Sequence, residues 1–263
     1  MYTVSDIVSS KIESYCRTWR MELEDTNSIL TGDKIVSASS TAQSTSISDD
    51  IELGAICSQS WNMTISDTET AFLGKEYDTY LYLVDYETSG ILADEKIPMG
   101  RFTCVKSKKS GGSVQLTMAD KLYFSDKPYV PHIPMPNWNK AVEDDICRQL
   151  GLQNGNDYTE VRLLRDKNGR RLIDKNGKVL YSKYFYFKVS SVPKDVTMRQ
   201  MLSYLASAQG EFGYVDRYGK YVRKWYGKSV KTLDNNTIDL PTLSERQNVI
   251  VGIICKVGED VTL

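Results

Sequence analysis

The chain has 263 residues, of which 41% are hydrophobic and 25% are charged, enough for one large domain or two modest ones. No apolar run approaches the roughly 18 residues that a membrane-spanning helix needs, so an integral membrane protein is excluded. The formal net charge of −1 conceals two halves of opposite sign: residues 1–130 carry −7 and residues 131–263 carry +6. Such a split is typical of nucleic-acid contact or of two surfaces that dock on neighbours in an assembly.

The first 125 residues predict mostly β structure. After a short helix at 2–12, a strand is expected at 14–24, where large apolar side chains alternate with charged ones from Trp19 onward. Segment 37–50 holds eight Ser or Thr in fourteen positions. Composition alone indicates a flexible linker, but we prefer a polar edge strand inside one domain, because apolar segments follow at once. Further short strands separated by turn signals indicate an antiparallel barrel or sandwich.

The character of the chain changes at residues 128–136, where four prolines in nine positions disfavour helix interiors and central strands. This segment predicts a domain boundary. A helix is expected from Trp138 to Leu150, with Asn137 as its N-cap. A second helix begins at a capping box over Thr197–Gln200, and Gly210 stops it.

A small internal repeat lies between these helices. The unit Asp-Lys-Asn-Gly at 166–169 recurs at 174–177, and Asn-Gly is typical of type I′ hairpin turns. We predict a compact meander here and a third, related turn at Asp216–Gly219. The units also resemble the opening of a calcium loop, but Arg170 and Lys178 stand where oxygen ligands are required. A metal site is therefore not expected.

Candidate catalytic groups are few. The five cysteines form no CxxC pair, which argues against both a zinc site and a disulfide framework. His132 is the single histidine, and we expect it to be structural or on the surface. The acidic pairs Asp49-Asp50 and Asp144-Asp145 consist of adjacent residues whose side chains point apart. No nucleotide-binding, hydrolase or metalloprotease motif occurs, so we expect no enzyme, no cofactor and no catalytic residues.

The basic, aromatic segment from Arg162 to Lys188 is the stronger candidate for binding. It carries nine basic residues against Asp166 and Asp174 alone, and alternating cations and aromatic rings can follow a phosphate backbone and stack bases. The alternative is a half-exposed hairpin sheet with its cations outward, which we favour. The residues for a polyanion or partner contact are Arg165, Arg170, Arg171, Lys175 and Lys178.

Several short motifs, taken in order, resemble the N-terminal hub module of phage and prophage tail proteins, the baseplate hub or tail-associated lysin family. They span essentially the whole chain and are Tyr15-Cys16-Arg17, ILTGDKI at 29–35, ELGA at 52–55, IPMGRF at 97–102, VQLTMADKL at 114–122, the helix at 197–209, and GYVDRYGK at 213–220.

The resemblance implies a mainly β fold with an α+β insertion. Its domains would be a β-barrel at 1–127, an inserted α+β domain at 128–211, and strands at 212–263 that return to the first barrel and begin a second. Members of this family typically form homotrimers that close the tail tube and bind the distal tail protein. The expected location is the virion tail, after assembly in the bacterial host cytoplasm, since no signal peptide is visible.

Two functional hypotheses follow. The first is a structural hub of a phage tail baseplate or tail tip, with self, distal tail and tail tube proteins as partners and no expected nucleic-acid contact. The second is a non-catalytic binding module that holds polysaccharide or single-stranded nucleic acid on strands 162–188.

Overall fold

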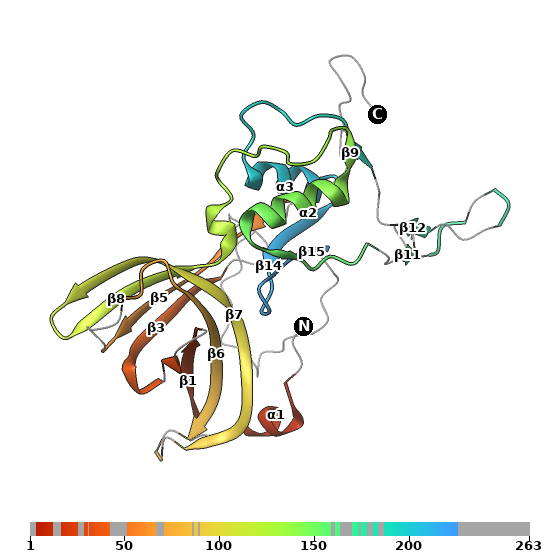
Figure 1. The fold of residues 1–263 in the computed structure, drawn as a ribbon. Coiled ribbons are helices and arrows are strands. Elements are labelled where there is room, and N and C mark those ends of the chain that lie inside the picture. The colour runs from red at the N-terminus through yellow and green to blue at the C-terminus, as the bar shows by residue number, and fades with distance from the viewer. Residues whose placement is uncertain are drawn as a thin grey trace, which may run out of the picture.

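The computed structural model describes residues 4–12, 17–25, 29–30, 32–42, 52–66, 71–85, 87–88, 90–158, 161–163, 170–173, 175–177, 181–183 and 187–225. Within these ranges the fold is mainly β, which confirms the predicted class. A large curved sheet forms one unit, and two helices packed on a smaller sheet form the other (Figure 1).

The first unit is a seven-stranded antiparallel sheet with the order β2-β1-β6-β7-β8-β5-β3. Short helical segments accompany it, α1 (Asp6–Ile12) and η1 (Gly32–Lys34). The strands are β1 (Arg17–Glu24), β2 (Ile29–Leu30), β3 (Ile35–Ala42), β5 (Gln59–Ile65), β6 (Glu76–Asp85), β7 (Ile91–Ser110) and β8 (Ser113–Ala119).

The two edge strands of this sheet are consecutive in the chain. β2 pairs with β1 at one end of the sheet, and η1 leads directly into β3, which pairs with β5 at the other end. The described strands form a curved sheet whose hydrogen-bonded ladder stays open, and the β-barrel at 1–127 stays a prediction. The ladder is open for a local reason: β2 contributes only two paired residues before η1 turns the chain away from β1.

The core of the first unit lies between the strands of the curved sheet. Leu23, Ile65, Phe102 and Met118 are almost completely buried there, and the ring of Trp61 meets that of Phe102 edge to face. Outside this core, β3 follows the predicted polar edge: its described side chains from Ser37 to Ser40 are exposed. The rest of the predicted edge strand, residues 43–50, lies outside the described residues.

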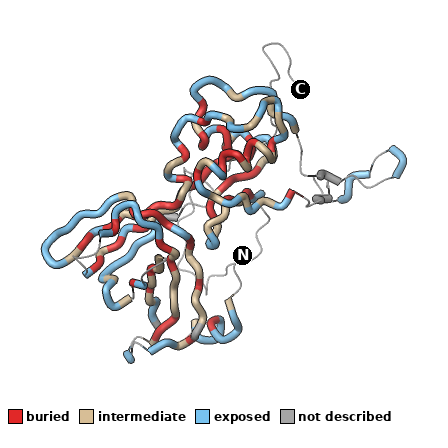
Figure 2. The backbone as a smooth tube through the Cα atoms, in the orientation of Figure 1, coloured by how far each residue is buried: buried red, intermediate tan, exposed pale blue. Residues whose placement is uncertain are grey.

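The second unit is a four-stranded sheet with two helices on one face. The sheet has the order β10-β15-β14-β4, and Val142, Ile146, Leu202 and Tyr221 are buried in the shared core. Figure 2 shows this second concentration of buried backbone, separate from the first. Its elements are β4 (Ile56–Cys57), η2 (Lys121–Phe124), β9 (Asn137–Trp138), α2 (Asn139–Leu150), β10 (Gln153–Asn154), β11 (Val161–Leu163), β12 (Tyr181–Lys183), β13 (Lys188–Val189), α3 (Met198–Ser207), β14 (Glu211–Val215) and β15 (Lys220–Trp225).

Local sequence signals fix the start of α3 and the turn between β14 and β15. The capping box at Thr197 and Gln200 starts α3 as predicted, and Asp216 accepts bonds from the amides of Tyr218 and Lys220 in the predicted turn. The predicted cap of α2 is wrong. Asn137 belongs to β9, which pairs with β13, so the N-cap position falls on Trp138.

The domain boundaries at residues 127 and 211 stay predictions, as does the second barrel, because residues 226–263 lie outside the described residues. Of the predicted third segment, β14 and β15 join the four-stranded sheet. There β14 pairs in parallel with β4, a strand from the first part of the chain.

Candidate functional site

The joint between the two units is built around the segment that leads into β4. The amide of Gly54 donates to the carbonyl of Glu211 at 2.7 Å, and the amide of Gly213 donates to the carbonyl of Ala55 at 2.8 Å. The Ser207 hydroxyl donates to the carbonyl of Leu53 at 3.2 Å. Gly54 has φ +82°, a conformation that favours glycine. The segment is thus held between the end of α3 and the start of β14.

Arg199, in the first turn of α3, is the second component of the joint. Its Nη1 donates to the carbonyl of Ile56 and its Nη2 to the carbonyl of Leu122, both at 2.8 Å. Its Nε donates to Asp126 Oδ1 at 2.7 Å. A planar guanidinium can reach several acceptors in fixed directions, which suits a contact among three segments.

Asp120, between β8 and η2, is the third component. Its buried carboxylate accepts bonds from the Ser58 hydroxyl at 2.8 Å, the Gln59 amide at 2.7 Å and the Leu122 amide at 3.0 Å. Burial raises its pKa to about 6, although these hydrogen bonds act in the opposite direction. The carboxylate therefore ties the end of the first sheet to the strand that crosses into the second.

A buried ionic cluster lies inside the second unit. Arg223 on β15 contacts Glu143 on α2, with Nε 2.7 Å from Oε1, and Glu211 on β14, with Nη1 2.8 Å from Oε2. These side chains are only 1–2% exposed. Burial raises the pKa of Glu143 to about 7, while the Arg223 guanidinium opposes that shift. No solute reaches these groups, so the cluster connects α2 to the sheet and does not form an open site.

Sequence reasoning missed this cluster. Glu211 and Arg223 lie on the two strands of one hairpin, but Glu143 comes from α2, about seventy residues earlier in the chain, and stands beside two other acidic residues. One signal was present: Arg223 lies two residues after Tyr221 in a strand, so both side chains point to the same face. Tyr221 is fully buried, which places the arginine inside as well.

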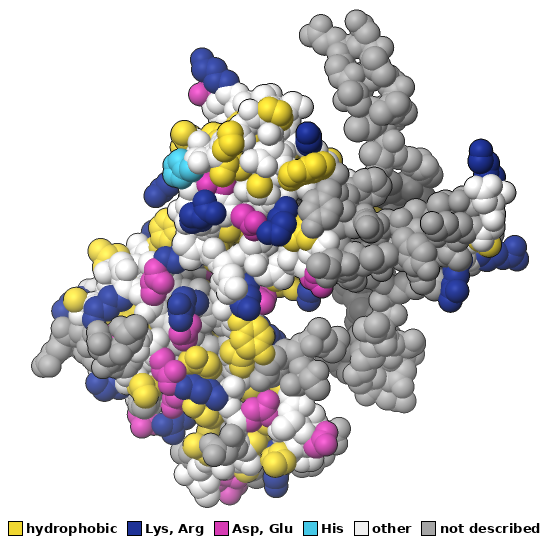
Figure 3. Space-filling view, turned by 45° about the vertical axis from the view of Figure 1, so that its right-hand side comes forward, with side chains coloured by type: hydrophobic (Ala, Val, Ile, Leu, Met, Phe, Trp, Pro, Cys, Tyr) yellow, Lys and Arg dark blue, Asp and Glu magenta, His cyan; other side chains and the backbone are white. Residues whose placement is uncertain are grey.

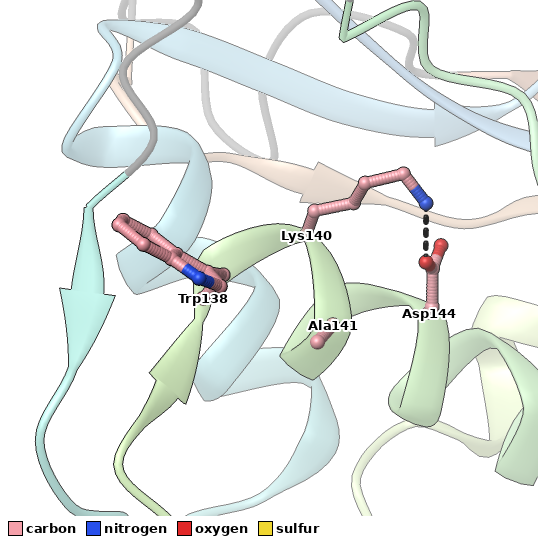
Figure 4. A pocket seen from close by; sticks show the side chains of 4 residues that line it. All are labelled: Trp138, Lys140, Ala141 and Asp144. Carbon is pink, nitrogen blue, oxygen red and sulfur yellow. Dashed lines mark hydrogen bonds and ion pairs between the residues drawn. The ribbon is translucent and has the colours of Figure 1, made fainter.

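A hollow of about 610 Å³ opens at the start of α2, lined by Trp138, Lys140, Ala141 and Asp144 (Figure 4). Lys140 Nζ lies 2.5 Å from Asp144 Oδ2 across one helical turn. Trp138 is 47% exposed, which is unusual for so large an apolar side chain.

The predicted basic residues lie away from this hollow. Arg170, Arg171 and Lys175 are exposed on a segment that projects from the second unit beyond β11 and β12 (Figure 1). Figure 3 shows Lys and Arg side chains at its far end. Arg165 and Lys178 lie outside the described residues, so the structure does not gather the five into one described cluster.

The other groups considered from the sequence are dispersed. His132 is exposed (Figure 3), and its backbone amide donates to Asp145. Asp144 pairs with Lys140, whereas Asp145 is buried and accepts from the Tyr129 hydroxyl, so the adjacent acids do point apart. Asp49 and Asp50 lie outside the described residues.

The part of the chain that the structure describes holds no group of three or more His, Cys, Asp or Glu arranged for a metal ion. Cys57, Cys104 and Cys147 are free and buried there. Among the described helices, none is long and apolar enough to cross a membrane.

Comparison with known proteins gave matches among solved structures only. No protein-family model matches the chain, and no curated protein matches it. The 43 kDa tail protein of prophage MuSo2 from Shewanella oneidensis is 13% identical with a TM-score of 0.43, and the alignment covers 81% of this chain and 57% of that protein. The tail protein from Neisseria meningitidis MC58 is 11% identical with a TM-score of 0.44, covering 78% and 50%. The chain spans 57% and 50% of the lengths of these two proteins.

Proposed function

We propose that the chain is a structural component of a phage or prophage tail. In this proposal it acts as a hub in the baseplate or tail tip, where three copies close the tail tube and dock on the ring of distal tail protein. It has no catalytic residues of its own. It is assembled in the cytoplasm of the bacterial host and remains in the virion tail.

The position of the sequence motifs in the fold supports this proposal. Four of the motifs that resemble the hub family meet at the joint between the two units: residues 52–55, 114–122, 197–209 and 213–220. They supply Gly54, Asp120, Arg199 and the β14–β15 hairpin. These four motifs thus supply residues that attach one unit to the other.

Such a joint suits an assembly protein. A subunit of a closed ring must present two different surfaces at a fixed angle, because a heterologous interface closes only for one rotation. Hydrogen bonds from Gly54, Gly213 and Arg199 restrain the two units. The opposite charges of the two halves of the chain, −7 and +6, favour contact between unlike surfaces of neighbouring copies.

Absolute mass in solution tests the trimer. Multi-angle light scattering across a concentration series should approach three chain masses, one chain being 29.8 kDa. High salt should shift the equilibrium toward the monomer, because exposed charges are screened. A mass that remains at one chain at the highest concentration contradicts the homotrimer.

Deleting the gene tests the tail role separately. A phage or lysogen that lacks the chain should release heads without finished tails, as seen by electron microscopy, and a plasmid copy should restore the tails. Normal tails in the deletion strain contradict the proposal.

The exposed cations on the projecting segment favour one second candidate, a module that binds polysaccharide or single-stranded nucleic acid. Changing the five predicted residues together to Ser tests it: Arg165, Arg170, Arg171, Lys175 and Lys178. Loss of polyanion binding with unchanged oligomeric mass supports the binding module. Unchanged binding, or no binding by the parent chain, contradicts it.

A further inference from the structure

The hollow at the start of α2 combines an exposed aromatic face with a polar rim. The Trp138 side chain stands on one side of the helix start and the Lys140–Asp144 pair on the other, with Ala141 between them (Figure 4). The small side chain of Ala141 leaves the space between them open. About 610 Å³ is available, which is within the usual range of small-ligand pockets, about 300–1,000 Å³.

The polar rim is locally neutral. Asp144 accepts from Lys140 through Oδ2 at 2.5 Å and from the Asn154 amide through Oδ1 at 2.7 Å. The Lys140 ammonium also lies 5.2 Å from the centre of the Tyr158 ring. Each carboxylate oxygen keeps a lone pair and the ammonium keeps protons to donate. The Lys140–Asp144 pair therefore offers donors and acceptors with no net charge of its own, and Lys188 adds one ammonium beside the Trp138 ring.

The aromatic wall is held in place before any ligand arrives. Trp138 lies in β9, opposite Lys188 of β13, and the Lys188 ammonium is 5.4 Å from the centre of its ring. The next residue begins α2. The amide of this residue, Asn139, donates to the carbonyl of Phe187 at 3.0 Å, which fixes the start of the helix beside the ring.

These features select the chemistry of the occupant. A flat ring with C–H groups on one face can cover the indole, while hydroxyl groups at its edge both donate and accept at the rim. We propose that the hollow at Trp138 is a saccharide-binding site that takes one or two neutral sugar rings of a polysaccharide.

This proposal goes beyond the assembly role and does not rest on it. Its residues lie on β9 and α2, apart from the joint around Gly54 and Arg199. A chain that is not a tail hub can still bind a saccharide here, and a tail hub can lack the site. The light-scattering and gene-deletion experiments therefore leave this proposal unaffected.

Isothermal titration of the full chain tests it with three probes: chitotetraose, maltotetraose and cellotetraose. At least one should bind, and Trp138→Ala should weaken that binding by about tenfold or more, since 1.4 kcal/mol corresponds to a factor of ten. Ala141→Leu should block binding while keeping the indole, because the longer side chain fills the hollow. Tyr204→Ala is the matched control, since it removes an aromatic side chain that is 53% exposed on α3.

Three outcomes would overturn the proposal. One is that none of the three probes binds at a concentration of about 10 mM, which would detect even a dissociation constant in the millimolar range. Another is equal binding by the parent, Trp138→Ala and Ala141→Leu chains. The third is Trp138-dependent binding of oligo-dT in place of the sugars. Should Trp138→Ala prove unfolded by circular dichroism, Ala141→Leu decides the question alone.

Discussion

Gly54 lies so close to Ser207 that a Cβ atom added to it would stand 1.8 Å from the Ser207 hydroxyl oxygen. The same atom would be 2.7 Å from the backbone oxygen of Ser203, which cannot rotate away. The backbone of Gly54 also has φ +82°, a conformation that favours glycine. At this point of the joint, where α3 packs on the segment leading into β4, a side chain therefore has no room.

Gly54→Ala should therefore destabilise the chain by about 3 kcal/mol, from backbone strain and overpacking together. Gly74→Ala is the matched control, because Gly74 has φ +79° but no atom within 4 Å of an added Cβ. That control should cost about 1 kcal/mol. Urea unfolding monitored by tryptophan fluorescence gives both values. Equal losses for the two variants would show that the close contact at Gly54 has no effect on stability.

Arg199→Ala should remove the side chain that joins β4, η2 and Asp126. The carbonyls of Ile56 and Leu122 then lose their charged donor, at an expected cost of about 3 kcal/mol. Arg101→Ala is a suitable comparison, since its pair with Asp78 has a 56% exposed guanidinium and should contribute under about 1 kcal/mol. Limited proteolysis provides a second readout, because a loosened joint exposes the segment around residue 54. Similar stability losses for both variants would contradict this role of Arg199.

The buried Glu143 predicts how stability varies with pH. Its folded pKa of about 7 lies above its ordinary value of 4.5, so the folded state retains a proton that the unfolded state has released between these values. The contribution of Glu143 to the free energy of unfolding should therefore be greatest near or below pH 4.5. It should fall as the pH rises toward 7, by up to about 1.4 kcal/mol per pH unit. Asp120, with a pKa of about 6, adds a fall in the same direction.

Glu143→Gln should reduce that slope, since the amide has no proton to lose, while Asp120 retains its own contribution. Urea unfolding at four values from pH 4.5 to 7.5 measures the slope for both chains. If the parent and Glu143→Gln chains show parallel dependence on pH, Glu143 is not the titrating group.

The described cysteines should be inert in the folded chain. Cys57, Cys104 and Cys147 are at most 2% exposed, and burial raises the pKa of Cys57 to about 11 and that of Cys147 still further. Thiolate is the reactive form, so both access and ionisation are suppressed. In a chain with Cys16 and Cys255 changed to Ser, Ellman's reagent at pH 8 should label no thiol until guanidinium is added, and then three. Rapid labelling of the native chain would contradict the burial.

Local chemistry made some of the fold predictable. The capping box of Thr197, the turn at Asp216 and the polar edge formed by β3 each depend on a few neighbouring residues, and each was confirmed. The cap of α2 was wrong because Asn137 takes part in β9–β13 pairing, a contact with a strand some fifty residues later. A local signal cannot show that competition.

The joint and the ionic cluster were less accessible from sequence. Gly54 could be identified as part of a motif, but its contact with Ser207 depends on how α3 packs on β4. Arg199 was named only as part of the capping-box segment, since its three acceptors come from separate segments that the sequence does not bring together. The hollow likewise required the structure, because the sequence placed Trp138 only at the start of a predicted helix.

The parallel pairing of β4 with β14 has a consequence for how the chain acquires its shape during synthesis. Ile56 meets Gly213, so the ribosome must release most of the polypeptide before that ladder can form. Contacts between such distant residues are slow to establish. The first sheet can begin to form while β4 still lacks its partner β14. The backbone groups of Ile56 and Cys57 that later pair with β14 are then without that partner. Pairing of β4 with β14 is therefore a late event in the synthesis and folding of the chain.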